Sequence, residues 1–316
     1  MAEETFETGG SPLYARVARE HADDPLLAEI ADGHKPLWEV PLKVFAGVHF
    51  LALAGRAPDP WSRFRDVLVA EREWLREFVR RQPIQTNEVQ RSWALLPAFL
   101  TVADERPLDL VELGPSAGLN LFWDRYRYRY ADVTWGSPEA PFELVGEATG
   151  GPPSSLFERA PTVRSRLGID RAPVDVRDEH QALFLESFVW ADQAARLDRL
   201  RGAIALARRE PPPLLAGDYV ELLPRVLADR PTGGLTIVYH SASTGYLRDD
   251  ERRRLESAIE EAGEAGPLAW VSYEFLEEEE PGFERFALDV RTWPAGETQR
   301  LARVDGHGNR MRWLTA

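Results

Sequence analysis

The feature that most constrains the fold of this chain is the segment from Leu108 to Asn120, LDLVELGPSAGLN. It opens with a short apolar run of the kind that fills a strand buried on both faces. The run contains Glu112 near its end, and a turn with Gly114 and Gly118 leads into a second apolar segment, which we expect to begin a helix. A strand, a glycine turn and a helix N-terminus bring backbone N–H groups to one point at the carboxyl edge of a sheet. Open α/β sheets bind ligands at that edge, so the segment predicts an α/β fold with a ligand site.

Composition limits the classes of function. The 316 residues, 44% hydrophobic and 28% charged, are typical of a globular protein with one large or two smaller domains. The net charge of −14 argues against nonspecific binding to nucleic acid or to an anionic membrane. The chain has no cysteine, and its six histidines form no spaced cluster with acids, so we expect no metal site.

The N-terminal sequence bears on location. It is acidic and lacks the apolar centre of a signal peptide. The most apolar stretch, residues 44–54, is shorter than the about 20 residues that cross a bilayer. We therefore expect a cytoplasmic protein that acts on a small molecule, with no nucleic-acid or membrane partner, and the sequence leaves the oligomeric state open.

Residues 1 to about 105 show a helical pattern. Apolar residues recur at helical spacing in residues 41–54 and again in residues 64–78. Asn87 is a candidate helix cap with Gln90 at the third position. No strand pattern precedes Leu108, so we predict a helical N-terminal domain (1–105) that covers the ligand pocket, followed by an α/β domain (106–316).

After the glycine turn, strand and helix patterns alternate. The predicted strands are 142–145, 172–176, 214–218, 235–239, 268–273, 286–293, 298–304 and 310–314. The predicted helices are 178–209, 219–227 and 249–262. The alternating run at residues 126–130 fits either a strand or the end of a helix. Strands that alternate with helices favour a parallel sheet, and the closing runs favour a terminal antiparallel hairpin.

This order of elements resembles the class I S-adenosylmethionine-dependent methyltransferases, a Rossmann-like α/β family, over residues 108–314. In that family an acidic-Gly-x-Gly-x-Gly turn follows the first strand and lies against the methionine part of the cofactor, and the turn here is a variant of it. The corresponding residues here are Glu112, Gly114, Ser116 and Gly118, with serine in place of the middle glycine. The resemblance implies that these residues and Asn120 bind S-adenosylmethionine.

The same resemblance implies roles for residues at other strand ends. An acid after the third strand lies near adenine in that family, and Asp218 matches it. An acid after the second strand holds the ribose: Asp175 if residues 172–176 are that strand, or Glu147 if residues 142–145 are. We favour Asp175, because the helix after it leads directly to the strand before Asp218.

The next strand end carries His240, which we predict to act as a general base on the methyl acceptor. Its neighbour Ser241 is a pocket candidate at the same edge. A structural histidine that bonds to a loop is the alternative for His240.

The chain is also similar, over most of its length, to a bacterial family known as domain of unknown function twenty-three thirty-two. The residues that carry this resemblance are Thr86-Asn87-Glu88-Val89 with Arg91, ELGPSAGLNL at 112–121, GID and PVDV within 168–176, Phe188-Val189-Trp190 with Gln193, Gly217-Asp218, and His240-Ser241. The resemblance implies that the helical region and the sheet belong to one architecture. It adds Asn87, Arg91, Trp190 and Gln193 as candidates for lining the pocket.

The turn has a second interpretation. Residues 114–118 match G-x-S-x-G, the nucleophile elbow of α/β-hydrolases, with Ser116 as nucleophile and Asp218 with His240 or His307 completing a triad. The missing upstream strands and the lack of an HGGG-type segment count against it. We therefore expect a methyltransferase that uses S-adenosylmethionine, with a noncatalytic ligand-binding or interaction protein and a serine hydrolase as alternatives.

Overall fold

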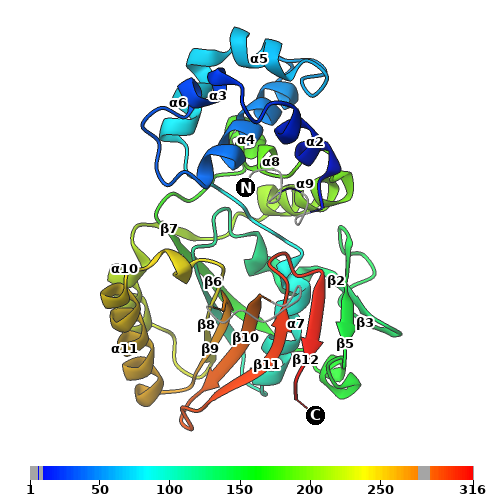
Figure 1. Cartoon of the computed structure of the whole chain (residues 1–316). Coiled ribbons are helices and arrows are strands. Elements are labelled where there is room, and N and C mark those ends of the chain that lie inside the picture. Colours follow the sequence, from blue (N-terminus) through cyan, green and yellow to red (C-terminus); the bar gives the residue numbers. More distant parts are fainter. Residues whose placement is uncertain (1–5, 7–9, 277–284, 316) are drawn as a thin grey trace. The chain divides into compact units, whose positions relative to one another are not determined.

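A computed structural model describes residue 6, residues 10–276 and residues 285–315 (Figure 1). The chain divides into two compact units. Unit 1 comprises Met1–Thr86 and Val174–Arg201, and unit 2 comprises Asn87–Pro173 and Gly202–Ala316. This division differs from the predicted boundary near residue 105, because residues 87–105 group with the sheet and residues 174–201 return to the helical unit.

The described part of unit 1 contains helices and no strand, as the N-terminal pattern predicted. Its elements are α2 (Pro12–Glu20), α3 (Pro25–Ile30), α4 (Glu39–Leu53), α5 (Phe64–Ala70), α6 (Arg72–Arg81), α8 (Glu179–Ser187) and the beginning of α9 (Ala194–Arg209). Ser11 and Asp24 cap α2 and α3 by accepting hydrogen bonds from the N–H groups of Tyr14 and Leu26. The buried rings of Phe6, Tyr14 and Phe45 pack together in the core of this unit.

Unit 2 is built on a nine-stranded sheet with the order β5-β12-β11-β10-β9-β8-β1-β6-β7. Its strands are β1 (Leu108–Leu113), β5 (Glu147–Thr149), β6 (Val163–Asp170), β7 (Leu214–Ala216), β8 (Leu235–Ser241), β9 (Leu268–Phe275), β10 (Phe286–Thr292), β11 (Thr298–Val304) and β12 (Arg310–Trp313). The five neighbouring strands β7, β6, β1, β8 and β9 are parallel to one another. Strands β10 and β11 are antiparallel to both of their neighbours, and β12 is antiparallel to β11 but parallel to β5. The fold is therefore mixed α/β with a large, mostly parallel sheet, and three strands in place of a simple hairpin close the chain.

The remaining elements of unit 2 surround this sheet. A small second sheet has the order β3-β2-β4, with β2 (Arg127–Tyr130), β3 (Val133–Trp135) and β4 (Glu143–Val145). The helices are α7 (Arg91–Val102), α10 (Tyr219–Ala228) and α11 (Asp249–Ala265), with short 3-10 segments η1 (Leu119–Arg125), η2 (Ser154–Glu158) and η3 (Thr244–Tyr246).

Alternation along the strands divides the core of unit 2 between two faces. Val111, Leu113 and Val238 belong to the apolar cluster that α10 and α11 complete. Residues of opposite parity face the other way, where the ring of Tyr239 meets Phe99 of α7 at a centroid distance of 5.0 Å. The central strands are buried along their length, which explains why their sequences are continuous apolar runs.

Several predicted elements differ from the observed ones. Residues 172–176 are not a strand, and the second strand of the parallel series is β6, which ends at Asp170. The segment after the glycine turn is the 3-10 segment η1, with a kink at Phe122, and not an α-helix. The predicted helix 178–209 is two helices, α8 and α9. Asn87 does not cap α7, which begins at Arg91.

The first half of β6 explains why this strand was missed. Its sequence is VRSR, which lacks the apolar run of a buried strand. Arg164 pairs with Asp109, and Arg166 pairs with Asp124. These carboxylates compensate the arginine charges that interrupt the apolar pattern of the strand.

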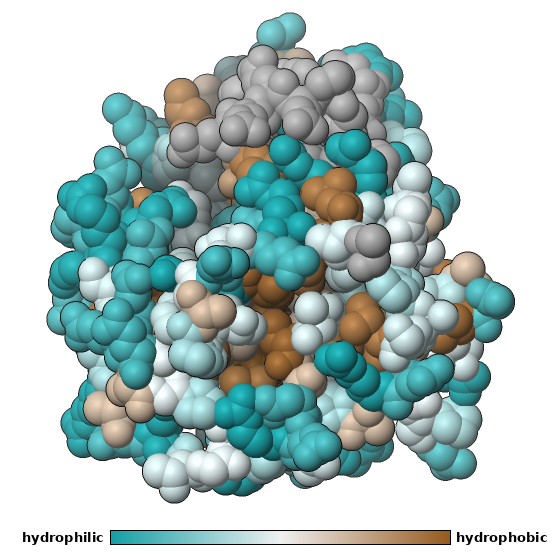
Figure 2. Space-filling model, turned by 90° about the horizontal axis from the view of Figure 1, so that it is seen from below, coloured by the Kyte–Doolittle hydropathy of each residue, from teal (hydrophilic) through white to brown (hydrophobic). Residues whose placement is uncertain are grey.

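Most of the surface that Figure 2 shows is hydrophilic, with hydrophobic residues gathered near the centre of that view. None of the helices in the described part of the chain combines the length and the apolar character that crossing a membrane requires.

Candidate functional site

The strand order identifies one edge of the unit 2 sheet as a switch point. From β1 the chain moves outward to β6 and β7 on one side, and then returns to β8 and β9 on the other. The carboxyl ends of β1 and β8 therefore lie side by side where the direction of winding reverses, with Leu113 opposite His240. Ligands of open α/β sheets bind in the crevice outside such a point.

The turn after β1 has unusual backbone angles and is closely packed against the loop after β8. Gly114, Ser116 and Gly118 all have positive φ, at 71°, 57° and 73°. A Cβ atom on Gly114 would lie 2.8 Å from the Cβ of Ser243, in the loop after β8. The hydroxyl of Ser243 donates to the carbonyl of Leu113 at 3.0 Å. Glycine at position 114 is thus required both by its backbone angles and by the close approach of the β8 loop.

Asp170 is the acid that holds this turn. Its Oδ2 accepts a hydrogen bond from the Ser116 N–H and its Oδ1 accepts one from the Ala172 N–H, both at 2.8 Å. Asp170 therefore occupies the strand end for which we predicted Asp175. The clue in the sequence was the GID run at the end of β6, which the charged residues before it obscured.

Neither Asp175 nor Glu147 is the acid at the end of β6. The Asp175 carboxylate lies in unit 1, is half-exposed and pairs with Arg177 at 2.7 Å. Glu147 begins β5, which pairs with β12 at the far edge of the sheet. Trp190 and Gln193 also belong to unit 1, where Trp190 packs against Phe6 at a centroid distance of 5.3 Å.

Glu112 is 2% exposed, on the face of β1 that carries Tyr239 of the adjacent strand. The hydroxyl of Tyr239 donates to its Oε2 at 3.1 Å. Burial raises the pKa of Glu112 to about 8, and the charge of Asp170 adds to the rise, whereas Tyr239 and Arg91 oppose it. A cation beside this buried carboxyl group would stabilise its ionised form, which is costly to bury without a partner.

His240 is 1% exposed, and its Nδ1 lies 2.7 Å from Oε1 of Glu274 in β9. The same Oε1 accepts hydrogen bonds from the N–H groups of Ser243 and Thr244, at 2.8 and 3.0 Å. Burial acts to raise the pKa of Glu274, but these bonds and the charge of His240 hold it below its usual value. Sequence reasoning missed Glu274, because it lies inside a strand with no motif around it.

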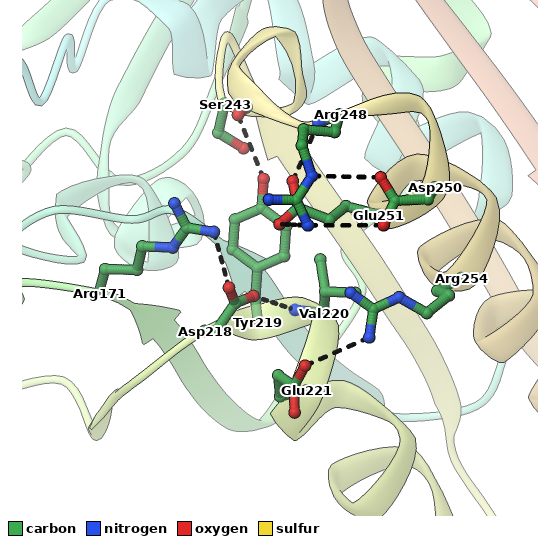
Figure 3. A network of polar contacts seen from close by, with 10 residues as sticks. All are labelled: Arg171, Asp218, Tyr219, Val220, Glu221, Ser243, Arg248, Asp250, Glu251 and Arg254. Atoms are coloured by element: carbon green, nitrogen blue, oxygen red, sulfur yellow. Dashed lines mark hydrogen bonds and ion pairs between the residues drawn. The ribbon is translucent and has the colours of Figure 1, made fainter.

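Asp218 follows β7, as predicted, and both its observed roles are structural. It caps α10 by accepting from the Val220 N–H at 2.8 Å, and it pairs with Arg171 at 2.6 Å (Figure 3). The adjacent Tyr219 donates to the carbonyl of Ser243 at 3.2 Å. The residue that follows Asp218 thus bonds to the same β8 loop that contacts Gly114.

Three further candidates, Asn87, Arg91 and Asn120, form hydrogen bonds between the α7 region and the turn or the end of β8. Oδ1 of Asn87 accepts from the Leu119 N–H at 3.0 Å, and Oδ1 of Asn120 accepts from the Ser92 hydroxyl at 2.8 Å. The guanidinium of Arg91 donates to the carbonyl of Ser241 at 3.1 Å. These bonds fix the backbone on both sides of the switch point.

The carboxyl edge of β1 and β8 contains strained backbone and buried polar atoms without a hydrogen bond among the described residues. Four non-glycine residues in the described part of the chain have positive φ, and two of them, Ser116 and Ala242, follow β1 and β8. Among the described residues, no group bonds to the buried hydroxyl of Ser116 or to the buried Nε2 of His240. Such features concentrate at functional sites.

Two other predicted site chemistries can be compared with the structure. Asp218 bonds to Arg171 and to α10, and the acid bonded to His240 is Glu274, so the predicted triad of Ser116, Asp218 and His240 is not assembled. The described residues contain no group of three or more histidine and acidic side chains placed to hold a metal ion.

Comparison with known proteins identifies a family for the chain. No curated protein matches the chain. Residues 2–313 match the model of a family described as "Uncharacterized protein conserved in bacteria (DUF2332)". This match extends over nearly the whole chain, and the protein therefore belongs to that bacterial family.

Proposed function

We propose that the protein is a methyltransferase that binds S-adenosylmethionine at the switch point of the unit 2 sheet and acts on a small-molecule acceptor. The observation that carries this proposal is the buried carboxyl group of Glu112, which lies just before a glycine turn at the end of the central strand. The parallel strands β7-β6-β1-β8-β9 also follow the 3-2-1-4-5 order of doubly wound nucleotide-binding sheets.

The residues at this edge suit such a ligand. The ammonium group of a methionine moiety would bring a cation to the buried Glu112 carboxyl, which bonds to Tyr239 and feels the charge of Arg91. It would also leave room for a bond to the hydroxyl of Ser116, which bonds to none of the described residues. Each oxygen of Asp170 keeps a second lone pair after its backbone bond, so this acid replaces Asp175 as the candidate for the ribose hydroxyls. Asp218 remains the candidate near adenine. When bound, the sulfonium of the cofactor would supply the methyl group.

Calorimetric titration of the full-length protein with S-adenosylmethionine and S-adenosylhomocysteine tests this proposal. Both are expected to bind, and Glu112→Gln is expected to weaken binding by about tenfold or more, because a hydrogen-bonded charge pair contributes about 1.5–3 kcal/mol. Glu251→Gln is the matched control, since Glu251 is also a buried glutamate of unit 2 but caps α11 through the Arg248 N–H. Absence of heat with either compound, in a protein with a cooperative thermal transition, would overturn the proposal.

One specific observation favours a second candidate, a serine hydrolase. Ser116 combines a G-x-S-x-G sequence, a positive φ and a buried hydroxyl that bonds to none of the described residues. The same strand edge also contains the hydrogen-bonded pair of His240 and Glu274. A fluorophosphonate probe decides between the two, with Ser116→Ala as control. The methyltransferase proposal expects no covalent label at Ser116, and expects Ser116→Ala to keep cofactor affinity within roughly tenfold, since at most one hydrogen bond of about 1 kcal/mol is lost. Labelling that Ser116→Ala abolishes would favour the hydrolase.

A further inference from the structure

Glu274 is an acid at the switch point with no place in the proposed cofactor site. It comes from β9, whose Ser272 lies opposite His240 in the parallel pairing of β8 and β9. One oxygen of its carboxylate, Oε1, meets His240, Ser243 and Thr244. Three polar neighbours on one buried oxygen indicate that this atom is an acceptor and that the group is ionised.

This geometry fixes the proton on the histidine ring. A backbone N–H can only donate, so the two amides already require Oε1 to accept. The Nδ1 of His240, 2.7 Å away, must therefore carry a hydrogen. In the neutral ring the lone pair is then on Nε2, the atom that bonds to none of the described residues.

A purely structural histidine is expected to have partners on both nitrogens, because a buried polar atom without a hydrogen bond destabilises the fold. Here one side of the ring is firmly bonded, and the ring of Trp270 lies at a centroid distance of 5.8 Å. The other side ends in an acceptor that bonds to no group in the part of the chain that the structure describes. This asymmetry is typical of a general base, whose free nitrogen bonds to a substrate.

Glu274 also connects the histidine to the glycine turn. It holds the N–H of Ser243, whose hydroxyl bonds to the carbonyl of Leu113 and whose Cβ packs against Gly114. One carboxylate thus sets both the orientation of the ring and the position of the loop against the turn. The proposed cofactor site and the free nitrogen are therefore held by the same group.

We propose that Glu274 is the positioning residue of a catalytic pair in which Nε2 of His240 accepts a proton from the methyl acceptor. This inference rests on the proposed function, and it narrows the substrate to a small molecule whose accepting oxygen or nitrogen carries a hydrogen. The proton of that O–H or N–H goes to Nε2, the lone pair that remains forms the bond to the methyl carbon, and the electrons of the broken sulfur–methyl bond stay on sulfur.

The test is the tautomer of His240 in the ligand-free protein. Long-range ¹H–¹⁵N correlation spectra of protein labelled with ¹⁵N-histidine, at a pH where the ring is neutral, distinguish the two nitrogens, and His240→Gln identifies the signals. The wild type is expected to show a protonated Nδ1 and a bare Nε2. Glu274→Gln, whose amide oxygen can still accept, should keep this form, and Glu274→Leu should shift the ring toward Nε2–H.

The matched control is Glu251→Leu, which removes another buried glutamate of unit 2 and should leave the His240 signals unchanged. A wild-type ring protonated at Nε2 overturns the inference, as does a Glu274→Leu variant that keeps the wild-type tautomer. If Glu274→Leu does not fold, the wild type and Glu274→Gln still decide. These spectra need no cofactor, so the two proposals can fail separately. If Nε2 carries no hydrogen but neither cofactor form gives heat in the titration, the methyltransferase proposal is rejected, whereas the role of Glu274 in orienting His240 stands.

Discussion

At the scale of single residues, Asp170 joins two strand ends through its bonds to Ser116 and Ala172. Asp170→Ala would leave the N–H of the buried Ser116 without its acceptor, so the free energy of unfolding should fall by about 1–3 kcal/mol. Denaturant unfolding measures this. Asp175→Ala is the control, because its half-exposed ion pair with Arg177 should contribute less than about 1 kcal/mol. If the two variants lose equal free energy of unfolding, the hydrogen bonds of Asp170 do not stabilise the turn as we expect.

Glu112 should make stability depend on pH. Its pKa is about 8 in the folded protein, mainly through burial, against a usual value of 4.5. The folded state therefore holds a proton that the unfolded state releases between these values. The stabilising contribution is complete below 4.5 and is lost as the pH rises through about 8.

Unfolding of the wild type and of Glu112→Gln, measured at about pH 5 and about pH 9, checks this dependence. Relative to Glu112→Gln, which does not titrate, the wild type should lose a few kcal/mol over that range. Parallel profiles for the two proteins would show that Glu112 is ionised in the fold at neutral pH.

At the scale of elements, the turn between β1 and η1 depends on glycine for two separate reasons. Gly118 has a φ of 73°, and a Cβ atom there would lie 2.9 Å from the Cγ of Pro212. Gly233 has a φ of 77°, and a Cβ atom there would meet nothing within 4 Å. Comparing alanine at the two positions therefore separates backbone strain from crowding.

Gly233→Ala should lower the free energy of unfolding by about 1–2 kcal/mol through strain alone. Gly118→Ala should lose about 1–3 kcal/mol more, because the added methyl group also overpacks the contact with Pro212. Thermal unfolding of both variants measures the difference. Similar losses would mean that the turn can shift away from Pro212 at little cost.

At the scale of the whole molecule, unit 1 is assembled from two separate stretches of chain. Phe184 and Phe188 of the second stretch are buried in a cluster with Phe50 and Phe78 of the first. A chain of residues 87–316 would keep the first two side chains and lack the others. It should therefore expose apolar surface, bind a hydrophobic dye such as anilinonaphthalene sulfonate, and aggregate more than the full-length protein.

Replacing Phe184 and Phe188 with serine in residues 87–316 is the control, and it should reduce the dye signal. If residues 87–316 bind no more dye than the full-length protein, then α8 does not depend on the N-terminal helices for its burial.

Local patterns were sufficient to predict β1, the glycine turn after it and most of the strand-helix alternation, because each depends on residues that are close together in the chain. A buried strand such as β8 must be continuously apolar, and a turn with positive φ favours glycine. The same local logic located Asp218 at the end of β7 and His240 at the end of β8.

The acids at the switch point depend on contacts between segments that are distant in the chain. The charges of Arg164 and Arg166 interrupt the apolar pattern of β6, and they are paired with Asp109 and Asp124 only in the folded protein. The local pattern therefore favoured Asp175 over Asp170. Glu274 lies 34 residues from His240 in the chain and reaches it only because β8 and β9 pair. Periodicity and turn chemistry act between near neighbours in the chain, whereas a hydrogen bond between strands depends on register, which the fold as a whole sets.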